Sequence, residues 1–274
     1  MTKKITWFFG VLTVVLLILG GRELMLQPDG KMHVVFFDVG QGDSALLTLS
    51  NGTRILIDGG PDWSTLEKLG KYMPFFDRTI DIVLLSHPNS DHMTSFPEVL
   101  RRYSVGTLVT AGTEYESGVY AATLSGASIH GVPHVMMHAS QKLTLDNGVL
   151  EVLWPPKIMP TGFSDDANNA SLVLRISHGE KSVLFTGDME SIVEKTLLAA
   201  DVNLTADILK VPHHGSKSSS TLEFLRAVQP KVAVISAGKN NSYGHPHPDV
   251  LARLTAMGAK ILRTDDVGDI ELKW

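Results

Sequence analysis

One short loop of the sequence concentrates side chains that bind metal ions. Residues 86–92 read Ser-His-Pro-Asn-Ser-Asp-His and directly follow an apolar run. Imidazoles and carboxylates are common protein ligands of divalent metals, so several of them on one loop can surround one or two ions. A polar loop with incidental histidines is the alternative. We favour a metal site with His87, Asn89, Asp91 and His92 as candidate ligands.

Further acidic and imidazole side chains stand where other apolar runs stop. Asp58, Asp188 and the pair His213-His214 each lie within three residues of the end of such a run. In layered α/β folds ligands gather at strand ends, so we expect these separate segments to meet at one site. For Asp58 a supporting role is equally open, as a carboxylate that accepts a hydrogen bond from a neighbouring histidine ligand.

The composition restricts the chemistry that is available. The chain has no cysteine, which excludes disulfides, thiolate metal sites, a cysteine nucleophile and a lipidated cysteine anchor. It carries 24 Lys and Arg against 29 Asp and Glu, a net charge of −5. This balance excludes the strongly basic surface of a tight, non-specific nucleic-acid binder. A polyanionic substrate would therefore need metal ions or a local patch to attract it.

The N-terminus predicts a membrane or export segment. Lys3 and Lys4 precede the uncharged apolar run 5–21, which is about 25 Å long as a helix at roughly 1.5 Å per residue. Residues 19–23 are a poor signal-peptidase site, so we favour an uncleaved anchor over a cleaved signal peptide. The run also lacks the polar face of a surface helix. Positive charge before it places the N-terminus in the cytoplasm and the remainder outside.

The rest of the chain has two halves with the same order of elements. In each half, β-hairpins come first and strand–helix units follow, which indicates two packed sheets with helices outside. A helix is predicted over residues 64–72, with Ser64 as N-cap and Glu67 at the capping-box position. The region 112–139 has no clear pattern. We divide the chain into an anchor or signal segment (1–21), a linker (22–31) and one domain (32–274).

Taken together, these residues resemble a known family. The loop His-x-Asn-x-Asp-His is similar to the His-x-His-x-Asp-His signature of the metallo-β-lactamase superfamily. The flanking phrases resemble the C-terminal hydrolase domain of ComEC-type DNA-uptake proteins, in order along residues 32–274; they are segments 37–44, 57–60, 168–174, 185–188, 210–216 and 243–248. The resemblance implies an αββα sandwich of two mixed β-sheets packed face to face, here with one N-terminal transmembrane helix.

The resemblance also implies a ligand for each position of a two-metal centre. His87, Asn89 and Asn168 match a first site, and Asp188 matches the carboxylate that bridges both sites. The second site matches Asp91, His92 and His214. Zinc enzymes of the superfamily carry histidine at positions 89 and 168, and relatives of this subgroup often carry aspartate at 89. Because an amide oxygen is a weaker ligand, we expect the first site to be weak, or to take an oxygen-preferring ion.

One or two divalent ions, Zn²⁺ or Mn²⁺, are therefore the expected cofactors. Asp91 would orient the attacking water. We assign His213 to phosphate contact or acid catalysis, and His245 and His247 to leaving-group oxygens, with a structural loop as the alternative for the last two. The residues expected to bind substrate or to support the site are Asp38, Asp58, Asn168, Ser171, Lys217, His245 and His247.

The expected reaction is hydrolysis of a phosphodiester, with single-stranded DNA as first candidate and phosphorylcholine esters as alternative. Hydrolysis of another ester, amide or lactam, and a non-catalytic binding or assembly protein, also remain open. A ComEC-type channel has many membrane helices and an additional DNA-binding module. With a single apolar segment (5–21), this chain is expected to work beside such a channel or as an independent surface hydrolase on the cell membrane, or secreted if the segment is cleaved.

Overall fold

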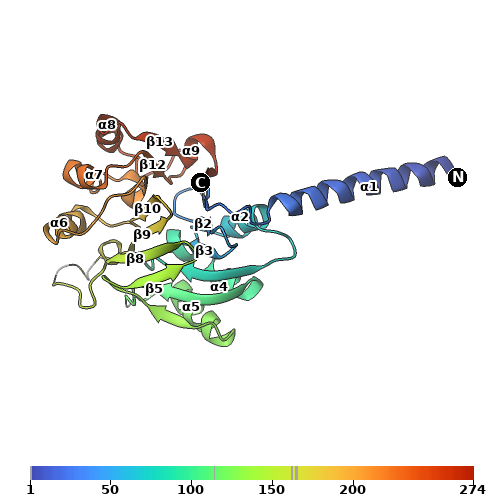
Figure 1. The fold of residues 1–274 in the computed structure, drawn as a ribbon. Coiled ribbons are helices and arrows are strands. Elements are labelled where there is room, and N and C mark those ends of the chain that lie inside the picture. Colours follow the sequence, from blue (N-terminus) through green and yellow to red (C-terminus); the bar gives the residue numbers. More distant parts are fainter. Residues whose placement is uncertain (1, 114, 162, 164–165) are drawn as a thin grey trace.

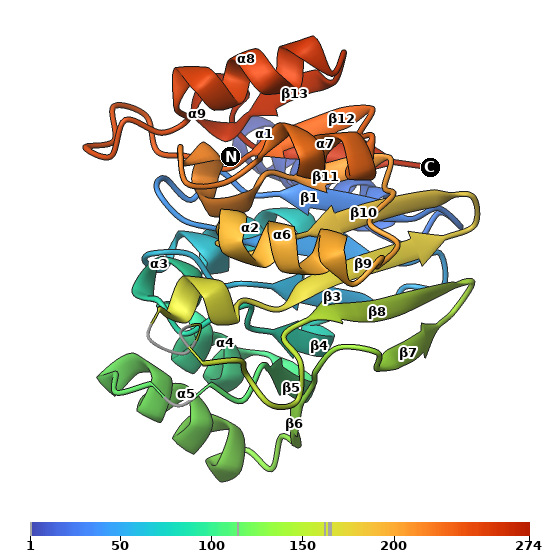
Figure 2. The same cartoon turned by 90° about the vertical axis from the view of Figure 1, so that its left-hand side faces the viewer.

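Two seven-stranded β-sheets form the body of the protein in the computed structural model, which describes residues 2–113, 115–161, 163 and 166–274. The sheets pack face to face and helices cover their outer faces (Figures 1 and 2). This arrangement confirms the predicted αββα sandwich. A long apolar helix, α1 (Thr2–Met25), projects from one end of the body.

Each sheet is mixed, with antiparallel strands on one side and parallel strands on the other. The first sheet has, in spatial order, β14 (Ile270–Lys273), β1 (His33–Phe36), β2 (Ala45–Thr48), β3 (Arg54–Ile57), β4 (Thr79–Leu84), β5 (Ser104–Thr110) and β6 (His134–Met136). The second has β13 (Lys260–Arg263), β12 (Val232–Ile235), β11 (Ile208–Lys210), β10 (Lys181–Phe185), β9 (Val173–His178), β8 (Gly148–Trp154) and β7 (Lys142–Leu145). The pairs from β3 to β6 and from β10 to β13 are parallel.

The helices fall into two outer layers. Those that cover the first sheet are α2 (Ser64–Tyr72), α4 (Phe96–Arg102) and α5 (Gly118–Ile129). Those that cover the second sheet are α6 (Ser191–Ala199), α7 (Leu222–Val228) and α8 (Pro248–Ala256). Short turns occupy the loops; they are α3 (Ser90–Met93), α9 (Thr264–Val267) and the 3₁₀ turns η1 (Ala167–Ala170) and η2 (Pro212–Gly215).

The central strands are buried on both faces, since successive side chains point to opposite sides and the two sides are covered by the other sheet and by helices. In β1, Val34 and Phe36 face the other sheet, whereas Val35 packs under the helices. Phe36 stacks on Phe185 of the second sheet, with ring centroids 5.6 Å apart. This double burial explains why the strands are continuous apolar runs, and it gives the loops at their ends a rigid base.

Three details differ from the sequence analysis. The N-cap of α2 is Trp63, so the prediction of Ser64 as N-cap was wrong: Ser64 is already the first helical residue. The unassigned region 112–139 contains α5 and β6. Finally, α1 continues four residues into the expected linker, to Met25, because the first proline of the sequence is Pro28.

Candidate metal centre

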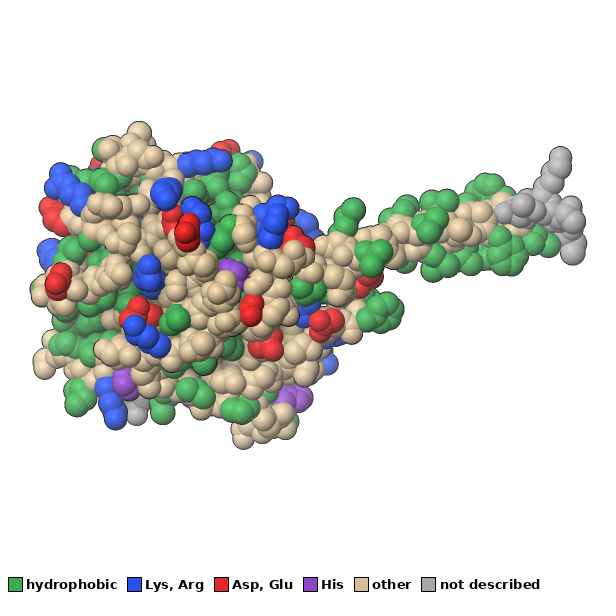
Figure 3. All heavy atoms as spheres, in the orientation of Figure 1, with side chains coloured by type: hydrophobic (Ala, Val, Ile, Leu, Met, Phe, Trp, Pro, Cys, Tyr) green, Lys and Arg blue, Asp and Glu red, His purple; other side chains and the backbone are tan. Residues whose placement is uncertain are grey.

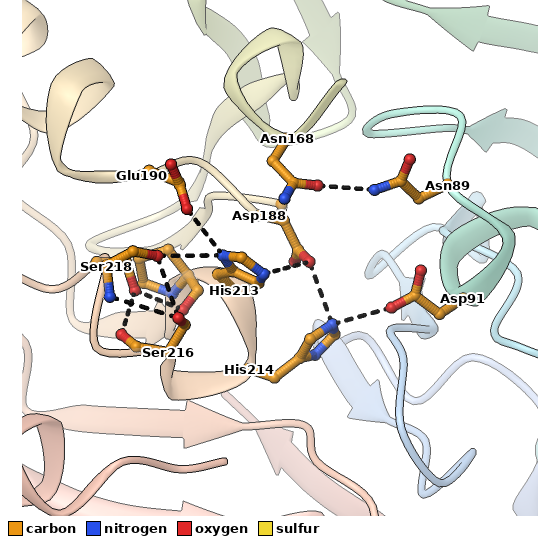
Figure 4. Close-up of polar contacts among 12 residues, drawn as sticks. Asn89, Asp91, Asn168, Asp188, Glu190, His213, His214, Ser216 and Ser218 are labelled. Atoms are coloured by element: carbon orange, nitrogen blue, oxygen red, sulfur yellow. Dashed lines mark hydrogen bonds and ion pairs between the residues drawn. The ribbon is translucent and has the colours of Figure 1, made fainter. Parts of the chain in front are cut away.

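The candidate ligands meet at one edge of the sandwich because of where strands end. The parallel neighbours β3 and β4 lie in the first sheet, and β10 and β11 in the second. Asp58 follows β3, the 86–92 loop follows β4, Asp188 follows β10 and His214 follows β11. Carboxylate and imidazole groups from distant segments therefore point toward one another (Figure 4).

Unusual backbone conformations aim several of these side chains. Asp58, His213 and His214 have positive φ angles of 59°, 50° and 53°. Non-glycine residues in this region cost about 1–3 kcal/mol each, which the surrounding packing must offset. Gly187 is also at positive φ. A side chain is sterically excluded at this position as well, because a Cβ would lie 2.7 Å from the Cβ of Ser171. Strain at the turns that carry candidate ligands is consistent with selection for geometry over stability.

Four side chains form the central cluster, and Asp188 lies between its two histidines. Its Oδ2 is 3.2 Å from His214 Nε2 and 3.4 Å from His92 Nε2. Asp91 completes the group, with Oδ2 3.3 Å from His214 Nε2 and 3.8 Å from His92 Nε2. One ligand atom from each of the four residues falls within 4.8 Å of all the others, which matches the donors around a single ion.

The chemistry of these donors fits a divalent cation. Within the described part of the chain, no hydrogen-bond partner is found for Nε2 of His92 or His214, nor for Oδ1 of Asp188. Buried polar atoms that lack partners are costly, and a cation would satisfy all of them at once. Two imidazoles and two carboxylates suit Zn²⁺ or Mn²⁺.

The electrostatic field of the cluster also favours a cation. Burial by itself would lower the pKa of His92 and His214, but the Asp188 carboxylate, helped by Asp58 and Asp43, raises the pKa of both well above the ordinary value. The carboxylates that raise these two pKa values give the site a strongly negative potential when both imidazoles are neutral. It therefore attracts a metal ion for the same reason.

Asp58 fixes the orientation of His92 from behind. Its Oδ2 lies 2.8 Å from His92 Nδ1 and accepts from the Ser86 hydroxyl at 2.7 Å, while Oδ1 accepts from the Ser86 N–H. This leaves Nε2 of His92 directed at the cluster. Carboxylates placed behind a histidine in this way set its tautomer and ring direction.

A buried ion pair that the sequence analysis missed supports His214. Lys210, only 3% exposed, places Nζ 2.6 Å from Asp43 Oδ2. Asp43 Oδ1 in turn lies 3.3 Å from His214 Nδ1, which also meets the carbonyl of Ser236 at 3.0 Å. Burial opposes ionisation of Asp43, yet Lys210 and then His214 hold its pKa below the usual range. The sequence signal for this pair was the position of Lys210 inside an apolar run and of Asp43 just before one.

The expected first metal site has a different structure. Asn89 donates from Nδ2 to Asn168 Oδ1 at 2.7 Å, so the two amides bind each other (Figure 4). Beside them, His87 is buried with its ring centroid 4.2 Å from that of His92. Burial, followed by the charge of His92, lowers the pKa of His87 to about 3, which keeps its imidazole neutral. Among the residues that the structure describes, His87 and Asp188 are the strong ligands that remain on this side.

The residues next to the cluster divide into two groups. His213 faces it, with Nε2 3.9 Å from Asp188 Oδ2 and Nδ1 3.6 Å from Glu190 Oε1. His245 lies 5.7 Å from His213 between ring centroids, and Tyr243 stacks on its ring. His247, by contrast, caps α8, since its Nδ1 accepts from the Asp249 N–H. The structure therefore gives His247 a structural contact and places His245 beside the cluster.

The remaining sequence-predicted residues contribute to the loops. Ser171 accepts from the Asp188 N–H at 3.1 Å, which fixes the backbone of a candidate ligand. The backbone N–H of Asp38 bonds to Asp269, and its carboxylate accepts from Gly40. Lys217 is exposed and lies 3.7 Å from Asp249. Of these three, Ser171 has the most direct contact with the cluster.

The sequence is similar to one known family and to several curated proteins. The model of a family described as the metallo-β-lactamase superfamily matches residues 37–239. ComE operon protein 3 of Bacillus subtilis is 33% identical over 266 residues, which cover 91% of this chain and 34% of that protein. Competence protein ComA of Neisseria gonorrhoeae is 32% identical, over 89% of this chain and 32% of that protein. The chain spans about a third of the length of these curated relatives.

Solved structures share the fold at low sequence identity. Igni18, a metallo hydrolase of Ignicoccus hospitalis, aligns with a TM-score of 0.60 at 16% identity, over 88% of this chain and 98% of that one. The metallo-β-lactamase fold protein YhfI of Bacillus subtilis gives 0.58 at 13% identity, over 90% and 100%. Zn²⁺-bound PqqB of Methylobacterium extorquens gives 0.56 at 12% identity, over 88% and 99%. These likenesses concern the fold alone.

Proposed function

The chain belongs to the metallo-β-lactamase superfamily, and from that premise we propose that it is a membrane-tethered, metal-dependent phosphodiesterase that acts outside the cytoplasm. The observation that carries the proposal is the convergence of Asp91, His92, Asp188 and His214, whose buried donor atoms fit a divalent ion. The apolar helix α1, with a candidate membrane span at Trp7–Met25, supports the tether.

The residues around the cluster have distinct tasks in this proposal. A bound ion would acidify water and stabilise the negative charge that develops on a phosphoryl group. Asp91, whose side chain is 32% exposed, accepts a hydrogen bond from the attacking water and orients it. His213, steadied by Glu190, donates a hydrogen bond or proton to the phosphate or leaving oxygen. The neutral Asn89–Asn168 pair closes the other side of the cluster.

Single-stranded DNA is the substrate that we propose first. Two relatives carry names that refer to competence or its operon, and the third, 28% identical, is recombination protein 2 of Haemophilus influenzae. The exposed ring of Tyr243, stacked on His245 beside the cluster, supports a substrate with a flat base, because bases stack on aromatic faces. A separate DNA-uptake channel is the proposed partner.

The test is metal-dependent cleavage by the full chain in detergent. We expect hydrolysis of bis-p-nitrophenyl phosphate and single-stranded DNA with Mn²⁺ or Zn²⁺, its loss after chelation and its return when the ion is restored. Faster cleavage of p-nitrophenyl phosphorylcholine than of DNA would favour the phosphorylcholine alternative. Metal bound without turnover of any of these esters would contradict the enzymatic proposal and favour a binding protein.

The asparagine pair predicts how many ions the chain binds. Because Asn89 and Asn168 satisfy each other, we expect one ion per chain after dialysis, held by the four-residue cluster. The double variant Asn89→His/Asn168→His replaces that bond with two imidazoles beside His87 and should bind two. Elemental analysis of the purified proteins measures the ratio.

A histidine introduced on the surface is the control for metal ions that bind an added imidazole non-specifically. Asn147 is exposed in the turn between β7 and β8, so Asn147→His should leave the ratio at one. Two ions in the unmodified protein would show that the neutral amides still complete a second site.

A further inference from the structure

An exposed aromatic pair stands beside the base of α1. Phe75 and Phe76, in the loop between α2 and β4, are 63% and 89% exposed. Their rings meet edge to face, with centroids 5.1 Å apart. Side chains as large and apolar as these are unfavourable in water, so an exposed pair calls for a partner that covers it.

Hydrogen bonds tie this loop to the end of the helix. The Phe75 N–H donates to Glu23 Oε2 at 2.8 Å, and Arg22 Nη2 donates to the carbonyls of Gly70 at 2.6 Å and Lys71 at 3.1 Å. The loop after α2 extends on the side from which α1 leaves the body (Figure 1). The position of the aromatic pair is therefore fixed relative to the helix.

These contacts set the level of the pair along the helix axis. Glu23 lies in the last turn of the candidate span Trp7–Met25, none of which is buried within the protein. If that segment crosses a bilayer, Glu23 lies near the headgroups, and Phe75 lies beside it. Hydrophobic side chains protrude from the body next to the helix, which is itself covered with them (Figure 3).

The charges around the pair suit a lipid surface. The Arg78 guanidinium lies 5.9 Å from the centre of the Phe75 ring. Nearby Asp77 is paired with Arg54 and Asp269 with Lys68 and Lys71, so the acidic groups are largely compensated. Aromatic rings with adjacent cations are the usual composition of membrane-interface anchors.

We propose that Phe75 and Phe76 insert into the outer interface of the bilayer that α1 spans, forming a second membrane contact that holds the catalytic domain against the lipid surface. This inference rests on the membrane tether of the proposed function. It commits to lipid as the occupant of the aromatic patch, because the hydrogen bond from Phe75 to Glu23 and those from Arg22 to the end of α2 place that patch at the level where the apolar helix ends.

The absence of cysteine from the chain permits a direct test with single labels. Phe76→Cys, Leu16→Cys and Ile192→Cys would each carry the environment-sensitive nitrobenzoxadiazole fluorophore. The full chain is reconstituted into vesicles of phosphatidylcholine and phosphatidylglycerol. Leu16 lies within α1, and Ile192 is an exposed apolar residue of α6, at the end of the body opposite α1 in Figure 1.

We expect nitroxide-labelled lipid to quench the fluorophore at position 76 several-fold more than the one at 192, with a blue-shifted emission at 76. Adding Phe75→Ser should reduce that shift. If aqueous iodide reaches position 76 as readily as 192 while lipid quenches position 16, the helix spans the membrane but the loop does not enter it, and the inference is overturned. If lipid fails to quench position 16 as well, the tether itself is wrong, and both proposals fall.

Discussion

Asp188→Asn is expected to lower the proposed metal-dependent phosphodiester turnover by about a thousandfold, equivalent to about 4 kcal/mol of transition-state stabilisation. The Asp188 carboxylate lies within 3.4 Å of both His92 and His214, so its loss removes the charge at the centre of the cluster. The amide has nearly the same shape, and the backbone bond from Asp188 to Ser171 is retained. Initial rates with bis-p-nitrophenyl phosphate, together with bound metal per chain, measure the effect.

A buried carboxylate away from the cluster provides the matched control. Glu194 is fully buried and accepts hydrogen bonds from Ser220 and Thr221 at the start of α7. Glu194→Gln should lower thermal stability but leave the metal content per folded chain unchanged. Equal losses of metal and activity in both variants would indicate that Asp188 matters only for folding.

Lys210→Met is expected to destabilise the domain by about 3–5 kcal/mol, since it leaves the Asp43 carboxylate buried without its partner. Lys210 and Asp43 are 3% and 5% exposed and 2.6 Å apart, so little solvent can reach either charge. Methionine has a similar volume, which limits any cavity. Urea unfolding of the metal-free chain in detergent measures the change without a contribution from bound ions.

Lys181 offers the same substitution at an exposed ion pair. Its Nζ lies 3.3 Å from Asp207, but the side chain is 43% exposed, so Lys181→Met should cost at most about 1 kcal/mol. Adding Asp43→Asn to the Lys210 variant should restore part of the loss, because the buried charge is then removed. Similar stabilities for the two lysine variants would refute a special role for the buried pair.

The fold and the meeting of the strand ends could be predicted because both depend on local patterns. Strands buried on both faces are continuous apolar runs, and the residues that follow them must lie at sheet edges. Asp188 and the 86–92 loop were identified in this way. The sequence does not show which polar side chains from distant segments contact each other, such as Asn89 with Asn168 or Asp43 with Lys210.

Two local errors have physical causes. The helix α5 escaped prediction because Gly118–Ile129 contains two glycines and several β-branched residues, and its buried positions are few. Ser64 was taken as an N-cap from its type and its spacing to Glu67. In the structure, Asp62 accepts from the Ser64 N–H and the helix starts one residue early. Asp62 thus occupies the Ser64 N–H that Glu67 would use in a capping box, and the spacing of Ser64 and Glu67 alone does not reveal this competition.

The attachment of α1 determines how the domain can move. A flexible linker in place of this helix would let the domain tumble and take up many heights above the proposed membrane. Arg22 and Glu23 instead bond the end of the helix to α2 and the loop after it, which fixes the direction of the helix relative to the domain. If α1 is the proposed tether, the candidate metal centre stays at one height above the membrane and reaches its substrate by diffusion in two dimensions. A DNA strand passing inward through a separate uptake channel, the proposed partner, would then be met by lateral diffusion of the whole chain.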